Sequence, residues 1–552
     1  MIELTPTILD ILQQRGMTDQ KDVEEFLSPK PKLTYDPFLL LNMKEGVDFV
    51  ISAVENNERI CIYGDYDVDG TTATALLYNF LTQLTDNITY YIPSRFEDGY
   101  GLNNDSLAQL KKDGVDVVIT VDCGAVSRKE VEYGKSIGLK IMVTDHHNME
   151  KDTAPDCIVI NPKHYDSQYP FLGLCGCAVA FKLVQAVVRT RELDRSNLIK
   201  PLDLVAVATV ADVVPLIDEN RTLVKYGLRQ VNRGTRKALR ILIEKLEIVP
   251  GTVDSYKIGF VIGPHLNAAG RMKNANGVVR MLISDDNREI HQIVQMLIEH
   301  NRERKTVQEK CYEESLNIVE NKYIDSPFLM IMPESIHEGI AGIVAGKIKE
   351  KYNKPTIVLS QSDDGREPIL KGSGRSIEEI DLIKMLLSHE SMFIKLGGHA
   401  MAAGFSIYAS NENGLREALQ KDMETLLKAN PRLLTKKINY DVTADVKDMN
   451  MELAKELKLL APFGMSNPKP VIKLEKITVS GLRYMGSENQ HVKFSCGFFD
   501  CVLFGNAQEY KSLLESGDRV TLYGNPDINI WNGRESVQFL IKSVAREDNN
   551  DN

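Results

Sequence analysis

The sequence has no uncharged apolar run of about 18 residues or more, which is the length that a bilayer-spanning helix needs. Its first residues, MIELTPTILDILQQRGMTD, lack the basic segment and apolar run that mark a secretory leader. It also has no internal repeat. We therefore expect a cytoplasmic protein that does not act in or on a membrane.

Cysteine is sparse and positive charge is in deficit. The closest of the eight cysteines, Cys175 and Cys177, do not have zinc-finger spacing, so we expect reduced and mostly buried thiols. The 66 Lys and Arg residues face 77 Asp and Glu residues, which makes the net charge −11. This balance argues against a protein that coats DNA non-specifically. A nucleic-acid enzyme stays possible, because carboxylates clustered in one site add to the negative total.

What the sequence does contain is an alternation of short apolar runs and helical patterns from about residue 46. The expected strands are 59–65, 88–93, 115–122, 139–145 and 157–162, with helices at 71–84, 105–114 and 129–138 between them. Strands that alternate with helices of this length predict βαβ units and a parallel sheet.

The rest of the chain has three further patterns. Residues 175–245 are largely helical in pattern, and a charged stretch at 286–321 predicts one long interdomain helix. A second α/β unit begins at about residue 327. Residues 437–546 contain short β-rich runs that predict a small β-barrel.

Three aspartates follow the first expected strand, in YGDYDVDG at 63–70. If the strand continued, Asp65, Asp67 and Asp69 would point to one face, and Gly70 would allow the turn into the next helix. Clustered carboxylates repel one another unless cations neutralise them, and oxygen-rich clusters suit Mg²⁺ or Mn²⁺. Taken alone, the motif is equally consistent with an acidic loop of Asx turns that leads into a helix N-cap.

Polar residues also end the third and fourth expected strands. Asp122 ends VITVDCG, and Asp145, His146 and His147 end IMVTDHH. Ligands bind beyond the carboxyl ends of the strands in an open parallel sheet, so these side chains can converge on one crevice. A lone His is more often structural, but two adjacent ones beside an aspartate cluster favour a metal site. Mixed nitrogen and oxygen ligands favour Mn²⁺ over Ca²⁺.

Asp212 interrupts the apolar helical run VAVATVADVVPL at 205–216. A lone buried carboxylate is costly unless a cation or hydrogen bonds satisfy it. Asp212 is therefore either a further metal ligand or a helix-terminal cap before Pro215.

Together these motifs resemble the DHH phosphoesterase superfamily, and six more in the same order resemble its RecJ family of bacterial single-stranded-DNA exonucleases. These are SRFEDGYGLN (94–103), GPHLNAAGRM (263–272), IHEGIAGIVA (336–345), GSGRS (372–376), GGHAMAAGF (397–405) and APFGMSNPKP (461–470). Each string is short, but their order is specific. The resemblance runs from about residue 20 to 545.

The resemblance implies an α/β protein whose parallel-sheet catalytic domain is joined by a long helix to a second α/β domain. An OB-fold β-barrel follows. The implied segments are an N-terminal extension (1–45), a DHH catalytic domain (46–285), a connecting helix (286–324), a DHH-associated domain (325–435), a nucleic-acid-binding OB fold (436–546) and a disordered tail (547–552). DNA would run through the cleft between the two α/β domains. OB folds commonly bind single strands with stacking aromatics and a basic groove.

By resemblance, five residues are ligands of two Mn²⁺ or Mg²⁺ ions: Asp67, Asp69, Asp122, His146 and Asp212. Asp122 is expected to bridge the ions. Asp65 would support the metal site, and His147 would support catalysis or contact a phosphate. Two such ions can activate a water and stabilise the leaving oxygen of a phosphodiester.

Contacts with DNA phosphates are implied for a further set: Arg95, Tyr100, His265, Asn267, Arg271, Ser373, Arg375 and His399. Ser373 and Arg375, on the GSGRS loop, would hold the 5′ terminal phosphate and so set the polarity. GPHLNAAGRM is expected to be a turn that presents Arg271, or else a helix start. His265 stands where the family has Arg, and His is shorter and only partly charged at pH 7. GGHAMAAGF surrounds His399 with small residues, which equally fits tight packing.

The implied activity is that of a single-stranded-DNA-specific 5′-to-3′ exonuclease, an exodeoxyribonuclease that releases 5′-mononucleotides in DNA repair and recombination. It would act as a monomer, with single-strand-binding protein and a RecQ-type helicase as partners. The alternative is a DHH phosphodiesterase of short oligonucleotides or cyclic dinucleotides, a class that typically lacks the N-terminal extension and the barrel. An inactive DNA-binding scaffold would have lost metal carboxylates that this chain keeps, and a manganese pyrophosphatase is much shorter.

Overall fold

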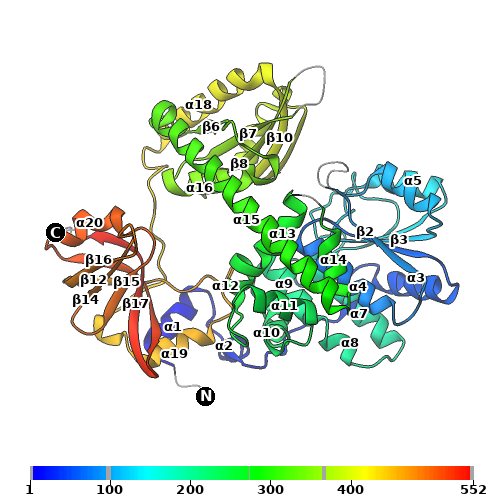
Figure 1. The fold of residues 1–552 in the computed structure, drawn as a ribbon, viewed down its shortest axis with the longest axis horizontal. Coiled ribbons are helices and arrows are strands. Elements are labelled where there is room, and N and C mark those ends of the chain that lie inside the picture. The colour runs from blue at the N-terminus through cyan, green and yellow to red at the C-terminus, as the bar shows by residue number, and fades with distance from the viewer. Residues whose placement is uncertain (1–3, 95–100, 273, 363–367, 548–552) are drawn as a thin grey trace.

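The computed structural model describes residues 4–94, 101–272, 274–362 and 368–547, and it contains three sheets in three parts of the molecule (Figure 1). The first part lies at the right of the view, the second at the top and the third at the left. Among the described helices, none is long and apolar enough to cross a bilayer.

The first sheet has the order β2-β1-β3-β4-β5 and is parallel throughout. Its strands are β1 (Ile60–Tyr63), β2 (Ile88–Tyr91), β3 (Val117–Val121), β4 (Lys140–Thr144) and β5 (Ile158–Ile160). Every residue of β1 and β3 is buried, as expected for strands covered by helices on both faces. The βαβ pattern expected from the sequence is thus confirmed.

Helices cover both faces of this sheet because successive strand residues point to opposite sides. Ile60 and Ile62 pack with α3 (Met43–Glu55), α4 (Val68–Leu81) and α7 (Gly176–Thr190). Cys61 and Tyr63 pack with α5 (Asn104–Lys112) and α6 (Arg128–Ser136). Because all five strands are parallel, their carboxyl ends meet at one edge of the sheet.

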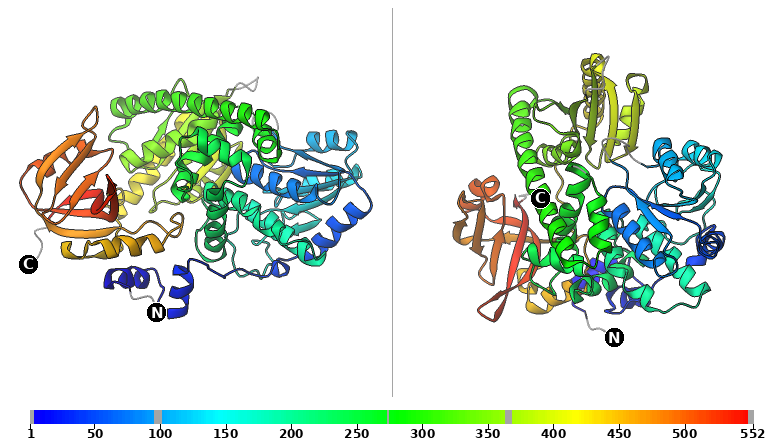
Figure 2. Two further views of the ribbon diagram at one scale, coloured as in Figure 1. Left: turned by 60° about the horizontal axis from the view of Figure 1, so that its bottom comes forward. Right: turned by 45° about the vertical axis from the view of Figure 1, so that its right-hand side comes forward.

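A helical layer completes the first part: α8 (Ser196–Ile199), α9 (Leu202–Ala211), α10 (Asp218–Arg233), α11 (Lys237–Lys245), α12 (Ser255–Lys257), α13 (Gly263–Met272) and α14 (Asn276–Ile283). The long helix α15 (Asn287–Ile318) follows and runs on into a π-helical turn at Val319–Tyr323 (Figure 2). Its first half places Ile290 and Val294 in the core of the first part, and Cys311 lies in the core of the second. The helix therefore belongs to both cores.

The second sheet has the order β6-β7-β8-β10-β9. Its elements are β6 (Leu329–Ile331), α16 (Glu338–Tyr352), β7 (Thr356–Ser362), β8 (Ile369–Arg375), α17 (Leu382–Leu387), β9 (Lys395–His399), β10 (Ala402–Tyr408) and α18 (Glu412–Ala429). Helix α16 packs on one face with Leu329 and Ile331, and α18 on the other with Met330. The predicted second α/β unit is confirmed.

The third sheet has the order β11-β12-β16-β17-β15-β14-β13. It comprises β11 (Val442–Thr443), β12 (Ile472–Ile477), β13 (Ser480–Met485), β14 (His491–Ser495), β15 (Asp500–Leu503), β16 (Val520–Trp531) and β17 (Arg534–Arg546), with helices α19 (Met451–Leu459) and α20 (Lys511–Glu515). The N-terminal helix α1 (Pro6–Gln14) buries Ile8, Ile11 and Leu12 in the core of this sheet, and α2 (Gln20–Leu27) buries Leu27 there. The two ends of the chain thus form one structural unit.

Candidate metal centre

The acidic motif enters a helix instead of continuing the first strand. Strand β1 ends at Tyr63, Asp67 is the N-cap of α4 and accepts a hydrogen bond from the amide of Gly70 at 3.1 Å, and Asp69 lies in the first helical turn. The expected one-faced strand, with Gly70 at a turn, is therefore wrong. Since α4 begins at Val68, the helix rather than a pleat directs the Asp69 carboxylate inward.

Asp69 is held by the start of a second helix. Its two carboxylate oxygens accept hydrogen bonds from the amides of Gly176 at 2.6 Å and Cys177 at 2.8 Å, at the N-terminus of α7. These amides have no partner within the helix, and the helix dipole favours an anion there. The Cys-Gly-Cys segment gives no sign of this support in the sequence, because its contact with Asp69 joins residues more than 100 positions apart.

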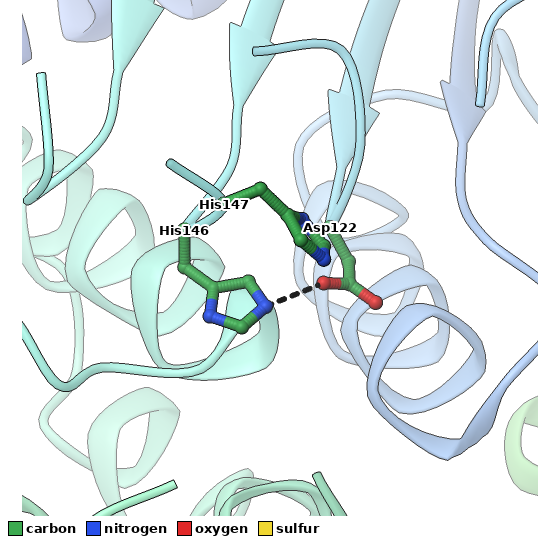
Figure 3. A group of neighbouring side chains, drawn as sticks. All are labelled: Asp122, His146 and His147. Atoms are coloured by element: carbon green, nitrogen blue, oxygen red, sulfur yellow. Dashed lines mark ion pairs between the residues drawn. The ribbon is translucent and has the colours of Figure 1, made fainter. Parts of the chain in front are cut away.

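Asp122 and His146 come from neighbouring strand ends and meet directly (Figure 3). Asp122 follows β3 with a φ of +61°, a left-handed conformation that Asp adopts more readily than most residues, and its amide donates to the carbonyl of Thr144. The Nε2 atom of His146 lies 3.1 Å from Asp122 Oδ1, 3.7 Å from Asp69 Oδ2 and 3.6 Å from Asp212 Oδ2. Asp212 is the C-cap residue of α9, which brings a third segment to the same point.

Asp145 organises the two histidines without joining the cluster. Its Oδ1 accepts from the amide of His146 at 2.7 Å and lies 2.8 Å from Nδ1 of His147, and its Oδ2 accepts from the amide of Ala125 at 2.7 Å. Burial opposes its charge, but the hydrogen bond and charge of His147 hold the pKa of Asp145 below its usual value. Asp145 was expected at this strand end with the two histidines, and its role as their hydrogen-bond acceptor is visible only in the structure.

The electrostatics of the cluster call for cations. Burial, reinforced by the charges of Asp69 and Asp67, raises the pKa of Asp122 well above its ordinary value. Burial and the same neighbours also raise the pKa of Asp212 well above normal. In contrast, burial lowers the pKa of His146, which favours the neutral imidazole that binds metals. The carboxylates therefore need protons or divalent ions to coexist.

Three overlapping groups of side chains have ligand atoms within 4.8 Å of one another: Asp65 with Asp67 and Asp122, Asp69 with His146 and Asp212, and Asp122 with His146 and His147. Asp122 belongs to two of them. Within the described residues, the buried Oδ2 of Asp212 has no hydrogen-bond partner, so it is available as a ligand. Carboxylates with one neutral imidazole fit Mg²⁺ or Mn²⁺.

Of the turn and the helix start that were open for 263–272, the structure has the helix, α13, and it packs against the acidic motif. A Cβ added at Gly270 would lie 2.5 Å from the Tyr66 carbonyl oxygen. The side-chain oxygen of Asn267 accepts from the amide of Val68 at 3.1 Å and so supports the start of α4. His265 is buried, and its Nδ1 lies 2.7 Å from the Val261 carbonyl of its own helix.

Arg271, Ser373 and Arg375 gather around the start of α16. Arg271 donates to the carbonyl of Gly339 at 2.9 Å, which links the first part to the second. A Cβ added at Gly342 would lie 2.9 Å from Ser373 Oγ and 2.6 Å from an Arg375 nitrogen. Ser373 and Arg375 lie on strand β8, so the expected flexible loop is wrong.

The remaining predicted contacts are separate from these groups. His399 is exposed at the end of β9, where β9 and β10 form a hairpin rather than a helix–strand contact. Arg95 and Tyr100 lie outside the described residues. Among the described residues, no carboxylate forms an ion pair with Arg375, which donates a hydrogen bond to the neighbouring Gly374 carbonyl at 2.7 Å.

Comparison with known proteins assigns the chain to a family. Three family models match: the DHH family N-terminal domain at 59–209, the DHHA1 domain at 325–426 and the RecJ OB domain at 440–543. The single-stranded-DNA-specific exonuclease RecJ of Bacillus subtilis is 33% identical over 99% of this chain and 68% of its own length. The protein of the same name from Escherichia coli is 32% identical over 98% of this chain and 96% of its own.

Solved structures agree. RecJ of Thermus thermophilus in complex with Mn²⁺ matches with a TM-score of 0.83 and 25% identity, over 99% of this chain and 76% of that one. A second structure, of exonuclease RecJ bound to manganese, has a TM-score of 0.60 and 29% identity over 70% of this chain and 95% of that one. The chain therefore belongs to the RecJ family of single-stranded-DNA-specific exonucleases.

Proposed function

We propose that this protein degrades single-stranded DNA from its 5′ end, releasing 5′-mononucleotides, with two Mn²⁺ or Mg²⁺ ions at the candidate metal centre. One observation carries the proposal: two groups of three possible ligands lie side by side. The first is Asp65, Asp67 and Asp122, and the second is Asp69, His146 and Asp212, whose His146 lies 3.1 Å from Asp122. The names of the relatives supply the substrate class, and the manganese complexes of related proteins support the choice of metal.

Each residue has a defined task in this proposal. Asp65 and Asp67 would hold one ion, Asp69, His146 and Asp212 the other, and Asp122 would lie between them. When bound, two such ions supply an activated water and neutralise the leaving oxygen.

Around the ions, protein groups would orient the reacting phosphate. Asp145 holds His147 through Nδ1. Burial alone would lower the pKa of His147, but the hydrogen bond and charge of Asp145 prevail and raise it. The remaining ring N–H of a protonated His147 can donate to a phosphoryl oxygen.

The polarity would come from the start of α16. Arg271, Ser373 and Arg375 present two guanidinium groups and a hydroxyl around a helix N-terminus, an arrangement that suits the 5′ terminal phosphate. Asn267, His265, His399, Arg95 and Tyr100 remain predicted contacts of the strand. Asn267 contacts the acidic motif through its side-chain oxygen, which accepts from the amide of Val68, and its amide nitrogen would donate to a phosphate.

We extend the proposal to the domain boundaries 46–285, 325–435 and 436–546. We also propose that the enzyme works in the cytoplasm as a monomer in repair and recombination, with single-strand-binding protein and a RecQ-type helicase. The chain's membership of the RecJ family supports these proposals.

Digestion of single strands labelled at either end, with and without a 5′ phosphate, tests activity and polarity together. We expect the 5′ label to appear first as a mononucleotide. Arg375→Ala should remove the preference for a 5′ phosphate, whereas the exposed Arg432→Ala should keep it. Release from the 3′ end would contradict the polarity. Cleavage of dinucleotides but not of long strands would favour the short-substrate phosphodiesterase.

Metal-dependent stability tests the ligand assignment. Manganese at 100 times its Kd should stabilise the wild-type protein by about 2.7 kcal/mol, and Asp122→Asn should lose most of this gain together with hydrolysis. Because Asp122 is crowded by buried like charges, Asp122→Asn should also melt higher than wild type without metal. The exposed Asp152→Asn is the matched control. An unchanged response to manganese in Asp122→Asn would remove Asp122 from the ligand set.

A further inference from the structure

A groove of about 1150 Å³ lies between the helical layer of the first part and the OB unit. Val213, Tyr256 and Phe260 line it from the first part, and Met465 and Pro526 from the OB unit. No metal ligand lines it, and it is larger than the roughly 300–1,000 Å³ of sites that enclose one small molecule. Its size suits an extended chain.

Two aromatic side chains in this groove are stacked but exposed. The rings of Tyr256 and Phe260 have centroids 4.8 Å apart and planes inclined by 29°, and the residues are 64% and 71% exposed. Phe260 lies in a π-helical turn, Ile258–Ile262, whose two end residues are buried. Single π-helical turns are rare and frequent at functional sites. This turn places Phe260 in solvent while Ile258 and Ile262 stay in the core.

The aromatic pair lies beside the end of α9, which carries Asp212. A Cβ added at Gly259 would lie 3.7 Å from a Val210 methyl, and one at Gly263 would lie 3.4 Å from Ala211 Cβ. Gly259 and Gly263, on either side of Phe260 in the chain, thus pack against Val210 and Ala211, which precede Asp212. Val213, directly after it, is 59% exposed with a φ of +60°, a strained conformation for a β-branched residue. The groove therefore begins next to the metal centre.

The charges around the groove favour an anionic occupant. Four lining residues are basic and two acidic: Lys225, Arg229, Lys458, Lys469, Asp254 and Asp527. Burial, then the charges of Arg221 and Arg229, lower the pKa of Lys225 to about 7, so the balance at neutral pH lies between +1 and +2 in a protein whose net charge is −11. An apolar floor with stacked aromatics and a positive rim matches the base faces and phosphates of a single strand. A duplex hides its base faces within the stack.

We propose that Tyr256 and Phe260 form a stacking platform for bases of a single DNA strand that leaves the metal centre through this groove. The platform would lie 3′ of the scissile phosphate, because Arg271, Ser373 and Arg375 are proposed to take the 5′ end. It would add affinity for long strands and select against paired bases. This inference rests on the proposed exonuclease function.

Length dependence gives the first test. Loss of one stacked base costs at least about fivefold in affinity, so the double variant Y256A/F260A should lose about tenfold or more in kcat/KM on a strand of about 20 nucleotides. Its kcat/KM on a trinucleotide should stay within about twofold of wild type. Phe260→Trp should retain the long-strand activity. Tyr408→Ala, which removes an exposed tyrosine from the second part, is the matched control.

Abasic strands separate stacking from a structural effect. A series of oligonucleotides, each with one abasic nucleotide at a successive position from the 5′ end, is bound to metal-free protein. The wild-type protein should lose about tenfold in affinity at one or two adjacent positions, and Y256A/F260A should show a flat profile.

The outcomes distinguish this inference from the proposed function. If wild type degrades long strands but Y256A/F260A behaves like Tyr408→Ala at every length, the platform is wrong while the exonuclease stands. The platform is equally wrong if Y256A/F260A still loses affinity at the same abasic positions as wild type. In that case a protein segment, not DNA, would be the occupant of the groove. If wild type does not degrade single strands at all, the proposed function itself fails.

Discussion

At the scale of single residues, the candidate site combines groups that the sequence marks with groups that it does not. Asp122 and His146 follow apolar strands, and the carboxyl ends of parallel strands share one edge, so their convergence was predictable. The role of Asp145 was not. It depends on which way a buried carboxylate turns, and the amide of Ala125, 20 residues away in the chain, decides that.

Asp145→Asn tests this positioning role. An amide cannot replace the charge that holds His147. It also places a donor in a carboxylate position where three backbone amides, those of Ala125, His146 and His147, need an acceptor. We expect manganese affinity and kcat/KM to fall by about 10–100-fold, the usual effect of losing a partner that orients metal ligands. Titration calorimetry with Mn²⁺ measures the first quantity. The exposed Asp105→Asn should match wild type, and equal affinity in both variants would show that Asp145 does not orient the site.

At the scale of elements, the start of α7 explains how two carboxylates approach so closely. Gly176 gives its amide to Asp69, and a Cβ at this residue would lie 2.5 Å from the Cβ of Asp122 and 2.6 Å from its Oδ1. Only glycine allows the helix N-terminus to contact both acids. The glycine was visible in the sequence, but its neighbours in space are 54 and 107 residues distant in the chain.

Gly176→Ala should therefore damage the metal centre. The added methyl group has to displace Asp122, so we expect loss of hydrolysis and of manganese binding, and a stability cost of about 1–3 kcal/mol. Gly346→Ala, inside α16, is the matched control, because a Cβ there meets nothing within 4 Å. That variant should be more stable than wild type by about 0.5–1 kcal/mol and fully active. Normal manganese binding by Gly176→Ala would refute the close approach.

At the scale of the whole molecule, one buried arginine joins three segments. Arg221, on α10, donates to the carbonyls of Phe26, Leu459 and Leu460, and its guanidinium lies 3.7 Å from the centre of the Phe26 ring. Burial, and then the charge of Arg15, lower its pKa to about 9. The first part, the N-terminal helices and the OB unit thus meet at a single side chain.

Arg221→Ala should loosen this junction. It leaves buried carbonyls without a donor, which costs roughly 1–3 kcal/mol. We expect faster amide hydrogen exchange in α2 and α19, with little change in the first sheet. Arg233→Ala, exposed at the end of the same helix, is the control. Unchanged exchange in α19 would mean that the OB unit is held elsewhere, for example by Arg15 and Asp441.

The sequence by itself determined the parallel sheet, the long helix, the second α/β unit and the strand ends that carry the candidate metal ligands. These follow from local patterns: buried strands need continuous apolar runs, and strand ends share one edge. The tertiary structure decided what depends on distant contacts. It joined Asp69 to the amides of Gly176 and Cys177, chose a helix for 263–272 where a turn or a helix start was open, and buried Ile8 and Ile11 in the core of the C-terminal sheet. It also left Tyr256 and Phe260 exposed. Phe260 lies in a π-helical turn that packs on α9, and the local sequence pattern does not predict such a turn, because its packing depends on residues about 50 positions away.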